Sequence, residues 1–348
     1  TGFKGSWLSL WLSQLGAEVF GVALDPQVNQ SEYSASQYNL SSSNHYLDIR
    51  DAIALKALVQ DIRPHFVFHL AAQALVRRSY SNPSETWQTN ALGTINLLDA
   101  LRPLKHQCIA ILITSDKCYE NAEWIWGYRE TDRLGGLDPY SASKAATEIA
   151  IHSYVHSFFP QDGFVRIGVA RAGNVIGGGD WAEDRIVPDC VRAWSKGLSV
   201  PLRNPMATRP WQHVLEPLSG YLSLAISLKN SPRLHGEAFN FGPYAEQNHS
   251  VAELVTAMSR HWDKVRLDDF SAHAGGPHES CQLKLNCDKA LHYLDWRPVW
   301  NFEQTVDYTV LWYRKYFEQL EGSLSCFSAQ QILDYQRSAK LQGRPWAQ

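Results

Sequence analysis

The chain has 348 residues, of which 45% are hydrophobic and 19% charged, with a formal net charge of −3. This length suffices for one large α/β domain and a smaller lobe, and the charge gives no electrostatic reason to expect a nucleic acid or an anionic membrane as partner. The six cysteines lack C-x-x-C spacing and no apolar run approaches the roughly 18 residues of a membrane span, so we predict no disulfide framework, no metal site and a cytoplasmic protein.

The first feature along the chain is a glycine pattern, Gly2-Phe3-Lys4-Gly5, typical of the end of a dinucleotide-binding turn. A helical apolar pattern follows from residue 6 to 15, and Gly16 is a good stop. Because a strand and a first glycine normally feed such a turn, we expect about ten further residues before Thr1.

A predicted strand over residues 18–24 ends at Asp25, which lies 23 residues after Gly2. An acidic residue at about 20 residues from the glycines can bind the adenosine ribose. No Lys or Arg between Pro26 and Ile49 is present to hold a 2′-phosphate, so NAD is favoured over NADP. Alternatively, Asp25 is only a turn residue before Pro26.

The alternation of strands and helices continues through the next hundred residues. We predict a strand over 45–49 that carries Asp48, a helix over 51–62, and a strand over 66–70 that ends in Ala71-Ala72-Gln73. The small residues after this last strand let the backbone approach a flat cofactor closely. A helix over 83–101 follows and carries Thr89.

An apolar run over 108–113 predicts a buried strand, which delivers Thr114, Ser115, Asp116 and Lys117 to its carboxyl end, where ligands bind in open α/β sheets. Tyr140 and Lys144 share one face of a predicted helix over 139–158. An ammonium beside a phenol favours the ionised phenol, so Tyr140 can act as a base. A lone Tyr-x-x-x-Lys is common by chance, but the order of turn, strand and helix favours catalysis.

A further strand over 164–171 completes a repeated β–α–β pattern, which predicts an α/β fold with a Rossmann-type doubly wound parallel sheet. We expect a dinucleotide-binding domain over 1–174. Residues 175–348 would form mainly a smaller mixed α/β substrate lobe, interleaved with the last sheet elements. There, Arg209 precedes an apolar helix over 214–228, although any single arginine is more often a solvated surface charge.

These motifs resemble the extended short-chain dehydrogenase/reductases and, within them, the nucleotide-sugar 4,6-dehydratases. The resemblance covers essentially the whole chain. Where the dehydratases of deoxythymidine-diphosphoglucose have Thr-Asp-Glu, this chain has Ser115-Asp116-Lys117. The pair Asp116-Lys117 and the opening pattern, Thr-Gly-Phe-Lys-Gly-Ser-Trp-Leu, are similar to those of dehydratases that act on CDP-glucose. The motifs are Thr1-Gly2-Phe3-Lys4-Gly5, Leu70-Ala71-Ala72-Gln73, Thr114-Ser115-Asp116-Lys117, Tyr140-Ser141-Ala142-Ser143-Lys144, Arg171-Ala172-Gly173-Asn174-Val175 and Arg209-Pro210-Trp211.

The resemblance implies a catalytic set and a reaction. Tyr140 would take the proton of the sugar C4 hydroxyl, which Ser115 orients, while Lys144 holds the nicotinamide ribose and lowers the pKa of Tyr140. Asp116 would protonate the departing C6 hydroxyl. Lys117 would either remove the C5 proton or remain charged and stabilise the enolate, and the residues leave both roles open.

The resemblance also implies ligands and an assembly. NAD would be the cofactor and CDP-glucose the substrate, on the route to the 3,6-dideoxyhexoses of bacterial O-antigens, and helices 83–101 and 139–158 would form a homodimer interface, with a dimer of dimers as the alternative. Spacing alone does not identify the nucleotide. A 4-epimerase and a non-catalytic NAD-sensing protein are rival functions. The cofactor set is Gly2, Phe3, Lys4, Gly5, Asp25, Asp48, Ile49, Leu70, Ala71, Ala72, Gln73, Thr89, Thr114, Tyr140, Lys144 and Arg171; the substrate set is Arg77, Ser115, Asn174, Arg185, Val187 and Arg209.

Overall fold

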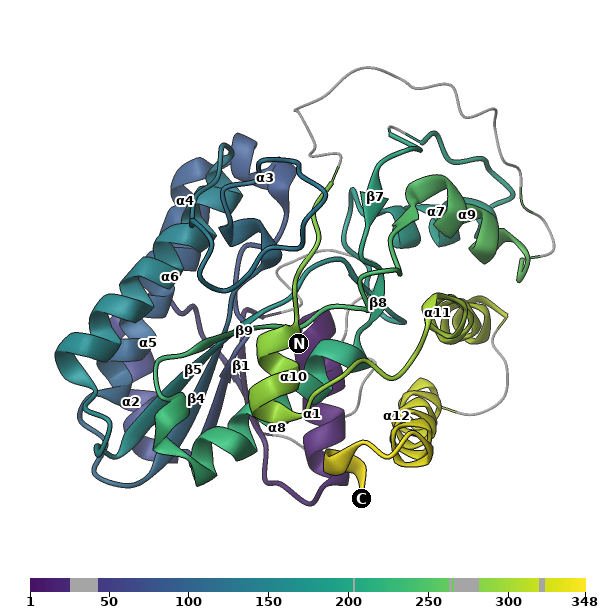
Figure 1. Cartoon of the computed structure of the whole chain (residues 1–348). Coiled ribbons are helices and arrows are strands. Elements are labelled where there is room, and N and C mark those ends of the chain that lie inside the picture. The colour runs from purple at the N-terminus through teal and green to yellow at the C-terminus, as the bar shows by residue number, and fades with distance from the viewer. Residues whose placement is uncertain (26–42, 203, 263–264, 266–281, 319–322) are drawn as a thin grey trace.

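A parallel sheet lies at the centre of the computed structural model, which describes residues 1–25, 43–202, 204–262, 265, 282–318 and 323–348 (Figure 1). Its strands are, in spatial order, β3 (Phe66–His69), β4 (Cys108–Ile113), β5 (Val165–Arg171) and β9 (Ala238–Asn240). All six residues of β4 are buried. A strand buried on both faces is the expected result of a continuous apolar run.

Helices cover both faces of this sheet. Ile109, Ile111 and Ile113 of β4 pack into a core with α1 (Phe3–Gln14) and α8 (Leu215–Asn230). The alternate residues of β4 pack on the other face with α2 (Ala52–Ile62), α5 (Gly93–Leu101) and α6 (Pro139–Phe158), the group at the left of Figure 1. The predicted doubly wound α/β fold is therefore confirmed.

Two further strands, β1 (Phe20–Ala23) and β2 (Ser43–Tyr46), form a separate parallel pair. In the described part of the chain, β1 pairs only with β2 and β3 only with β4. The second strand ends earlier than predicted. Asp48 lies in a turn instead, since its carbonyl accepts from Asp51 N and its side chain accepts from Arg50 N.

The helix predicted over 83–101 is interrupted. Its parts are α4 (Pro83–Trp87), a π-helical turn η2 (Gln88–Leu92) and α5, preceded by the short α3 (Val76–Ser81). The π turn contains Asn90, whose side chain bonds to both backbone groups of Gln73 and to Ser143 Oγ. This turn therefore ties the end of β3 to α6, as π turns often do at functional sites.

The second half of the chain contributes both to the central sheet and to a smaller group of short strands and helices. α8 packs on the central sheet, and β9 adds its last strand. The remaining segments surround two short strand pairs, in which β6 (Val175–Ile176) runs parallel to β8 (Gln212–His213) and β7 (Thr208–Arg209) antiparallel to β10 (His249–Ser250). The other helices are η3 (Asp116–Cys118), α7 (Ile186–Ser195), η4 (Pro232–Leu234), α9 (Val251–Ser259), α10 (Asp288–Leu294), α11 (Phe302–Phe317), α12 (Leu324–Leu341) and η5 (Pro345–Ala347).

Among the described residues, none of the helices has the length and apolar character needed to cross a membrane.

Candidate active site

A large cavity of about 2890 Å³ lies at the carboxyl ends of β3 and β4 and extends between β1 and β3. It is enclosed by the start of α1, by α6 and by loops of the second half. Every residue of the predicted catalytic, cofactor and substrate sets lines this cavity except Asp25 and Arg171. The fold thus brings together residues that are up to about two hundred positions apart in the chain, as expected for a site at strand ends.

The start of α1 is suited to an anionic group. Gly2 precedes the helix without a side-chain cap, and the first turn has no acidic residue. The space in front of Gly2 and Gly5 is open, since a Cβ on either would meet no atom within 4 Å. The uncapped N–H groups of a helix start attract phosphates, so these residues fit the pyrophosphate of a dinucleotide.

Two acidic residues of the predicted cofactor set differ in their surroundings. Asp48 lines the cavity and accepts from the Arg50 guanidinium at 2.8 and 3.0 Å, and this bonding lowers the pKa of Asp48. Asp25 follows β1 and is only half-buried, and it is not among the residues that line the cavity.

Arg171 does not reach the cavity. It is 4% exposed and makes a two-pronged salt bridge with Glu148, with both N–O distances at 2.8 Å. It also donates to Tyr119 Oη and to the carbonyl of Glu130. Because its donors are used by these buried partners, the structure gives Arg171 a structural place between β5 and α6 and does not support the predicted cofactor contact.

The end of β4 presents the predicted catalytic residues in a tight turn. Ser115 caps the short helix η3, and its Oγ accepts from Lys117 N at 3.2 Å. The same hydroxyl donates to Asp116 Oδ1 at 3.0 Å. Ser115 and Asp116 are buried, whereas Lys117 is half-buried and lines the cavity. The turn therefore fixes a hydroxyl and a carboxyl side by side.

The helix α6 places Tyr140 and Lys144 opposite this turn. Asp138 caps the helix by accepting from Ser141 N at 3.0 Å, and Pro139 occupies its first position. Tyr140 and Lys144 follow within the first two turns, and both are buried. The helix start is thus fixed by its sequence, and with it the place of the phenol.

Burial controls the ionisation of both groups. It raises the pKa of Tyr140 to about 12, an effect opposed by a hydrogen bond with Ser115 and by the charge of Arg185. It lowers the pKa of Lys144 to about 8. The residues that favour ionised Tyr140 are therefore Ser115 and Arg185, and not Lys144 as predicted from spacing.

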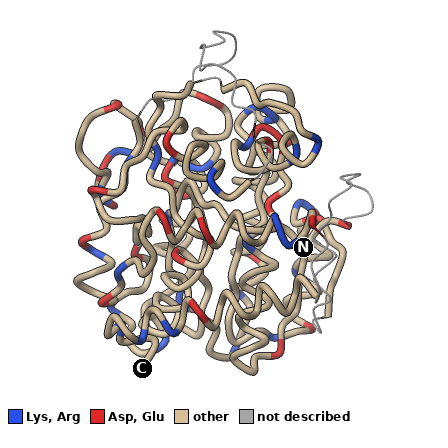
Figure 2. Tube along the Cα trace, turned by 90° about the vertical axis from the view of Figure 1, so that its right-hand side faces the viewer, with Lys and Arg blue, Asp and Glu red and all other residues tan. Residues whose placement is uncertain are grey.

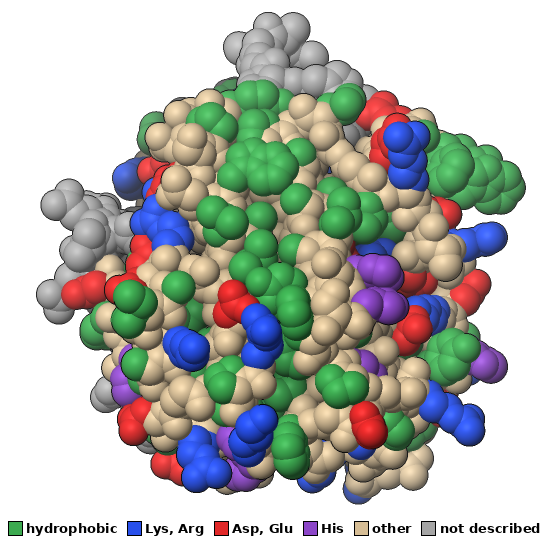
Figure 3. Space-filling model, turned by 90° about the vertical axis from the view of Figure 1, so that its left-hand side faces the viewer, with side chains coloured by type: hydrophobic (Ala, Val, Ile, Leu, Met, Phe, Trp, Pro, Cys, Tyr) green, Lys and Arg blue, Asp and Glu red, His purple; other side chains and the backbone are tan. Residues whose placement is uncertain are grey.

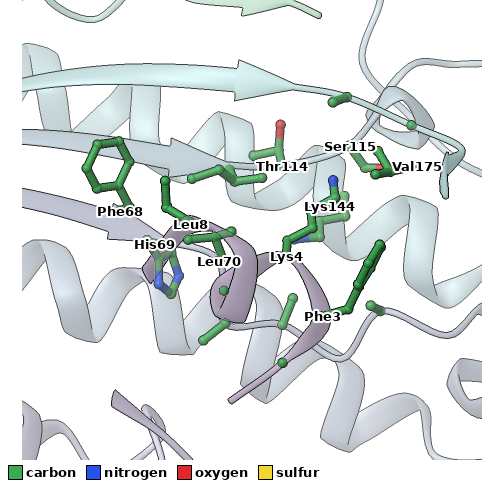
Figure 4. Close-up of a pocket in the computed structure, with 18 of the residues that line it drawn as sticks. Phe3, Lys4, Leu8, Phe68, His69, Leu70, Thr114, Ser115, Lys144 and Val175 are labelled. Atoms are coloured by element: carbon green, nitrogen blue, oxygen red, sulfur yellow. The ribbon is translucent and has the colours of Figure 1, made fainter. Parts of the chain in front are cut away.

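Lys4 has a different environment from the one its place in the glycine turn suggests. Its side chain extends from the start of α1 toward Lys144, on the side of Ser115 (Figure 4). Burial, with the charges of Arg185 and Lys144, lowers its pKa to about 8, while Asp116 and Asp180 oppose this. Lys4 therefore belongs electrostatically to the catalytic group.

The predicted substrate residues are held by partners that sequence analysis missed. Arg185 Nη1 lies 2.8 Å from Asp180 Oδ2, and Arg77 Nη1 lies 3.2 Å from Asp184 Oδ1. Asp180 and Asp184 come from the loop after three consecutive glycines, and no local pattern marks them as partners of these arginines. Arg209 Nη1 donates to the carbonyl of Thr208, and Val187 is buried in the cavity wall.

Comparison with known proteins identifies relatives of the whole chain. Residues 1–309 match the family model described as GDP-mannose 4,6 dehydratase. The chain is 44% identical over 341 residues to a CDP-glucose 4,6-dehydratase of Salmonella typhimurium, covering 96% of this chain and 94% of the relative. It is 31% identical over 271 residues to a dTDP-glucose 4,6-dehydratase of Streptomyces antibioticus, with 77% and 75% covered.

A solved structure supports the fold. A UDP-glucose 4-epimerase of Thermus thermophilus in complex with NAD superposes with a TM-score of 0.73 at 23% identity, covering 90% of this chain and 96% of that protein.

Proposed function

Because the chain belongs to the GDP-mannose 4,6 dehydratase family, we propose that it converts CDP-D-glucose to CDP-4-keto-6-deoxy-D-glucose with NAD as cofactor. The observation that carries this proposal is a buried carboxyl, Asp116, hydrogen-bonded to Ser115 beside Tyr140 in one cavity. An epimerase needs the serine, the tyrosine and the lysine, but it has no use for an acid at this place.

The cofactor would lie across the start of α1, with Gly2 and Gly5 facing its pyrophosphate and Lys144 near its nicotinamide ribose. Bound NAD supplies the acceptor of the C4 hydride, the donor for its return to C6, and a positive ring whose charge favours ionised Tyr140. The remaining steps use the protein's own residues.

Tyr140 takes the proton of the C4 hydroxyl. Ser115 would turn its one hydroxyl proton from Asp116 to the bound sugar and donate a hydrogen bond that orients the C4 hydroxyl. The resulting 4-ketone acidifies the hydrogen on C5. Lys117 then removes that proton, or it remains charged and stabilises the enolate while another group or water takes the proton. Asp116, in its neutral form, protonates the departing C6 hydroxyl, so that one water leaves.

The nucleotide would be held by residues from both halves of the chain. Arg77, Arg185 and Arg209 line the cavity, and guanidinium groups bind diphosphates through paired hydrogen bonds. Asn174 and Val187 would complete this wall. The choice of CDP is supported by the 44% identical relative.

The proposal extends to assembly, compartment and biosynthetic role. Trp87, Leu92 and Ile149 are exposed on α4, η2 and α6, and apolar side chains lie together on that side of the molecule in Figure 3. Such a face fits a homodimer formed by helices from both copies. The cytoplasm is the proposed compartment, and 3,6-dideoxyhexose formation for the O-antigen is the proposed role.

The test is a mass spectrum of CDP-glucose after incubation with the protein in deuterated water, with and without added NAD. We expect loss of one water and one deuterium retained at C5. CDP-glucose that is unchanged under both conditions, together with conversion of a UDP-sugar without water loss, would contradict the proposal and favour the epimerase.

A further inference from the structure

The backbone at Gly173 lies directly against the carboxyl group of Asp116. A Cβ atom on Gly173 would overlap both oxygens and Cγ of this carboxyl. Asp116 is 2% exposed, so the carboxyl is enclosed. Gly173 is therefore the residue whose missing side chain makes room for the catalytic acid.

The two oxygens of this carboxyl have separate donors. Ser115 Oγ donates to Oδ1 at 3.0 Å, and Asn174 Nδ2 lies 3.4 Å from Oδ2, a long hydrogen bond. Asn174 has a φ of 47°, in the left-handed region that most side chains avoid. We call Ser115, Gly173 and Asn174 the Asp116 support.

The second half of the chain anchors this support. Gln212 is 1% exposed, and its Nε2 donates to the carbonyls of Gly173 at 3.0 Å and of Phe241 at 3.1 Å. Its backbone N donates to Asn174 O at 3.3 Å. The pairing of β6 with β8 begins at the next residue, Val175. The Asp116 support is therefore held by the hydrogen bonds of Gln212 and by the pairing of β6 with β8.

We propose that Gly173 and Asn174 are positioning residues that orient Asp116 for the elimination step. This inference rests on the proposed function. In that step the Asp116 proton moves to the C6 oxygen, the C6–O bond breaks, a base takes the C5 proton, and water leaves without net redox change. The first step, at C4, depends on Ser115 and Tyr140 and does not need the Asp116 support beyond Ser115.

The two substitutions that test the proposal act on different contacts. Gly173→Ala displaces the carboxyl, and we expect water loss to slow about 100-fold, the effect of a misplacement of roughly 1 Å. Asn174→Gly keeps the left-handed backbone without strain and removes the amide, and we expect about a 10-fold slowing. In both, C4 oxidation and C5 exchange continue, so reduced nicotinamide and C5-deuterated sugar accumulate.

Controls separate positioning from general damage. Asp295→Gly changes another left-handed residue, at the end of α10, and should leave water loss unchanged. Calorimetry with CDP should give wild-type affinity for Gly173→Ala, because Gly173 has no side chain that could contact the nucleotide. For Asn174→Gly, which also removes an amide from the proposed substrate wall, the readout is the ratio of C5 exchange to water loss in enzyme saturated with CDP-glucose.

Each outcome has a distinct meaning. Water loss at the wild-type rate in folded Gly173→Ala overturns the role of Gly173. If Gly173→Ala does not fold, Asn174→Gly decides the matter. A wild-type ratio of C5 exchange to water loss in that variant overturns the proposal, whatever its affinity for CDP. A wild-type protein that exchanges no C5 hydrogen and releases no water contradicts the proposed function itself.

Discussion

Tyr140 and Lys144 are both buried, and burial acts on their pKa values in opposite directions. It raises that of the phenol to about 12 and lowers that of the ammonium to about 8, so burial disfavours the charged form of each. Ser115 supplies a hydrogen bond that favours the ionised phenol. The acid/base behaviour of this site therefore depends on contacts of a few atoms that lie far apart in the sequence.

Tyr140→Phe should abolish reduction of the bound cofactor on mixing with CDP-glucose, because the C4 hydroxyl then has no proton acceptor. A loss of at least about 100-fold is expected for a general base. Stopped-flow absorbance of reduced nicotinamide measures it. Tyr154→Phe removes a half-buried phenol from the same helix, which bonds to Asp99, and should retain the wild-type rate. Equal rates for the two variants would remove Tyr140 from the mechanism.

Asp116→Asn should separate the first half of the reaction from the second. The amide fills the space beside Gly173 but is a much poorer proton donor to the C6 oxygen, so water loss should slow about 100-fold or more. Exchange of the C5 hydrogen for deuterium should continue. Nuclear magnetic resonance of the recovered sugar measures exchange, and mass spectrometry measures water loss. A parallel decline of both rates would show that Asp116 acts earlier than proposed.

Lys117→Met should slow C5 exchange whether Lys117 is the base or the enolate-stabilising cation, since both functions need the amine. Lys117→Arg distinguishes them because arginine keeps the charge but does not accept a proton near neutral pH. Retained exchange in the arginine variant identifies the stabilising cation, and lost exchange identifies the base. Normal exchange in the methionine variant would exclude both roles and make Lys4, whose pKa is lowered to about 8, the next candidate.

Among the elements, the start of α8 contains an acid that the reaction does not use. Glu216 is 1% exposed and accepts hydrogen bonds from the backbone of Val299 and Trp300 and from Tyr335 of α12. Burial raises its pKa from 4.5 to about 7. This carboxyl joins α8 to a loop and a helix more than eighty residues later, so its ionisation is linked to the stability of the second half.

Glu216→Gln should flatten the pH dependence of stability. The folded protein holds the Glu216 proton more tightly than the unfolded chain, so this group stabilises the fold below pH 4.5 and loses that contribution as the pH rises to about 7. Relative to the glutamine variant, the free energy of unfolding of the wild type should fall by about 3 kcal/mol between these two pH values. Urea unfolding at several pH values measures it. Glu303→Gln, at an exposed position of α11, is the control, and the same profile for all three proteins would contradict the argument.

On the surface of the whole molecule, charged side chains are dispersed, whereas exposed apolar side chains of three helical segments lie on one side. Basic and acidic residues are intermingled over the molecule in Figure 2, in keeping with the net charge of −3. Exposed apolar side chains of α4, η2 and α6, by contrast, lie on one side of the molecule (Figure 3). An interface between two copies is therefore expected on this side and would be apolar.

Ile149→Glu should weaken the proposed dimer, because Ile149 is 61% exposed on α6 in the described chain and would be buried between two copies. The average mass measured by sedimentation equilibrium should shift toward that of the monomer. The dissociation constant of the dimer should rise at least about 10-fold. Ile53→Glu, the same substitution at an exposed site of α2, should not change the dissociation constant. A monomeric wild type would contradict the proposed assembly.

Local sequence patterns were enough to predict the parallel sheet and the order of its helices, and the residues predicted to be catalytic line one cavity. Cys108–Ile113 and Pro139–Phe158 are found as predicted, because continuous apolar runs, Pro139 and the Asp138 cap act locally. The end of β2 and the π turn within the helix from Pro83 to Leu101 were predicted incorrectly, since side-chain bonds and packing set them.

The surroundings of the site residues, by contrast, are set by contacts between distant parts of the chain. The salt bridge that removes Arg171 from the cavity, the space that Gly173 leaves for Asp116 and the burial that raises the pKa of Tyr140 all depend on distant partners. A local sequence pattern does not show which distant residue accepts the hydrogen bonds of a side chain. It also does not show how far burial removes that side chain from water and so shifts its pKa.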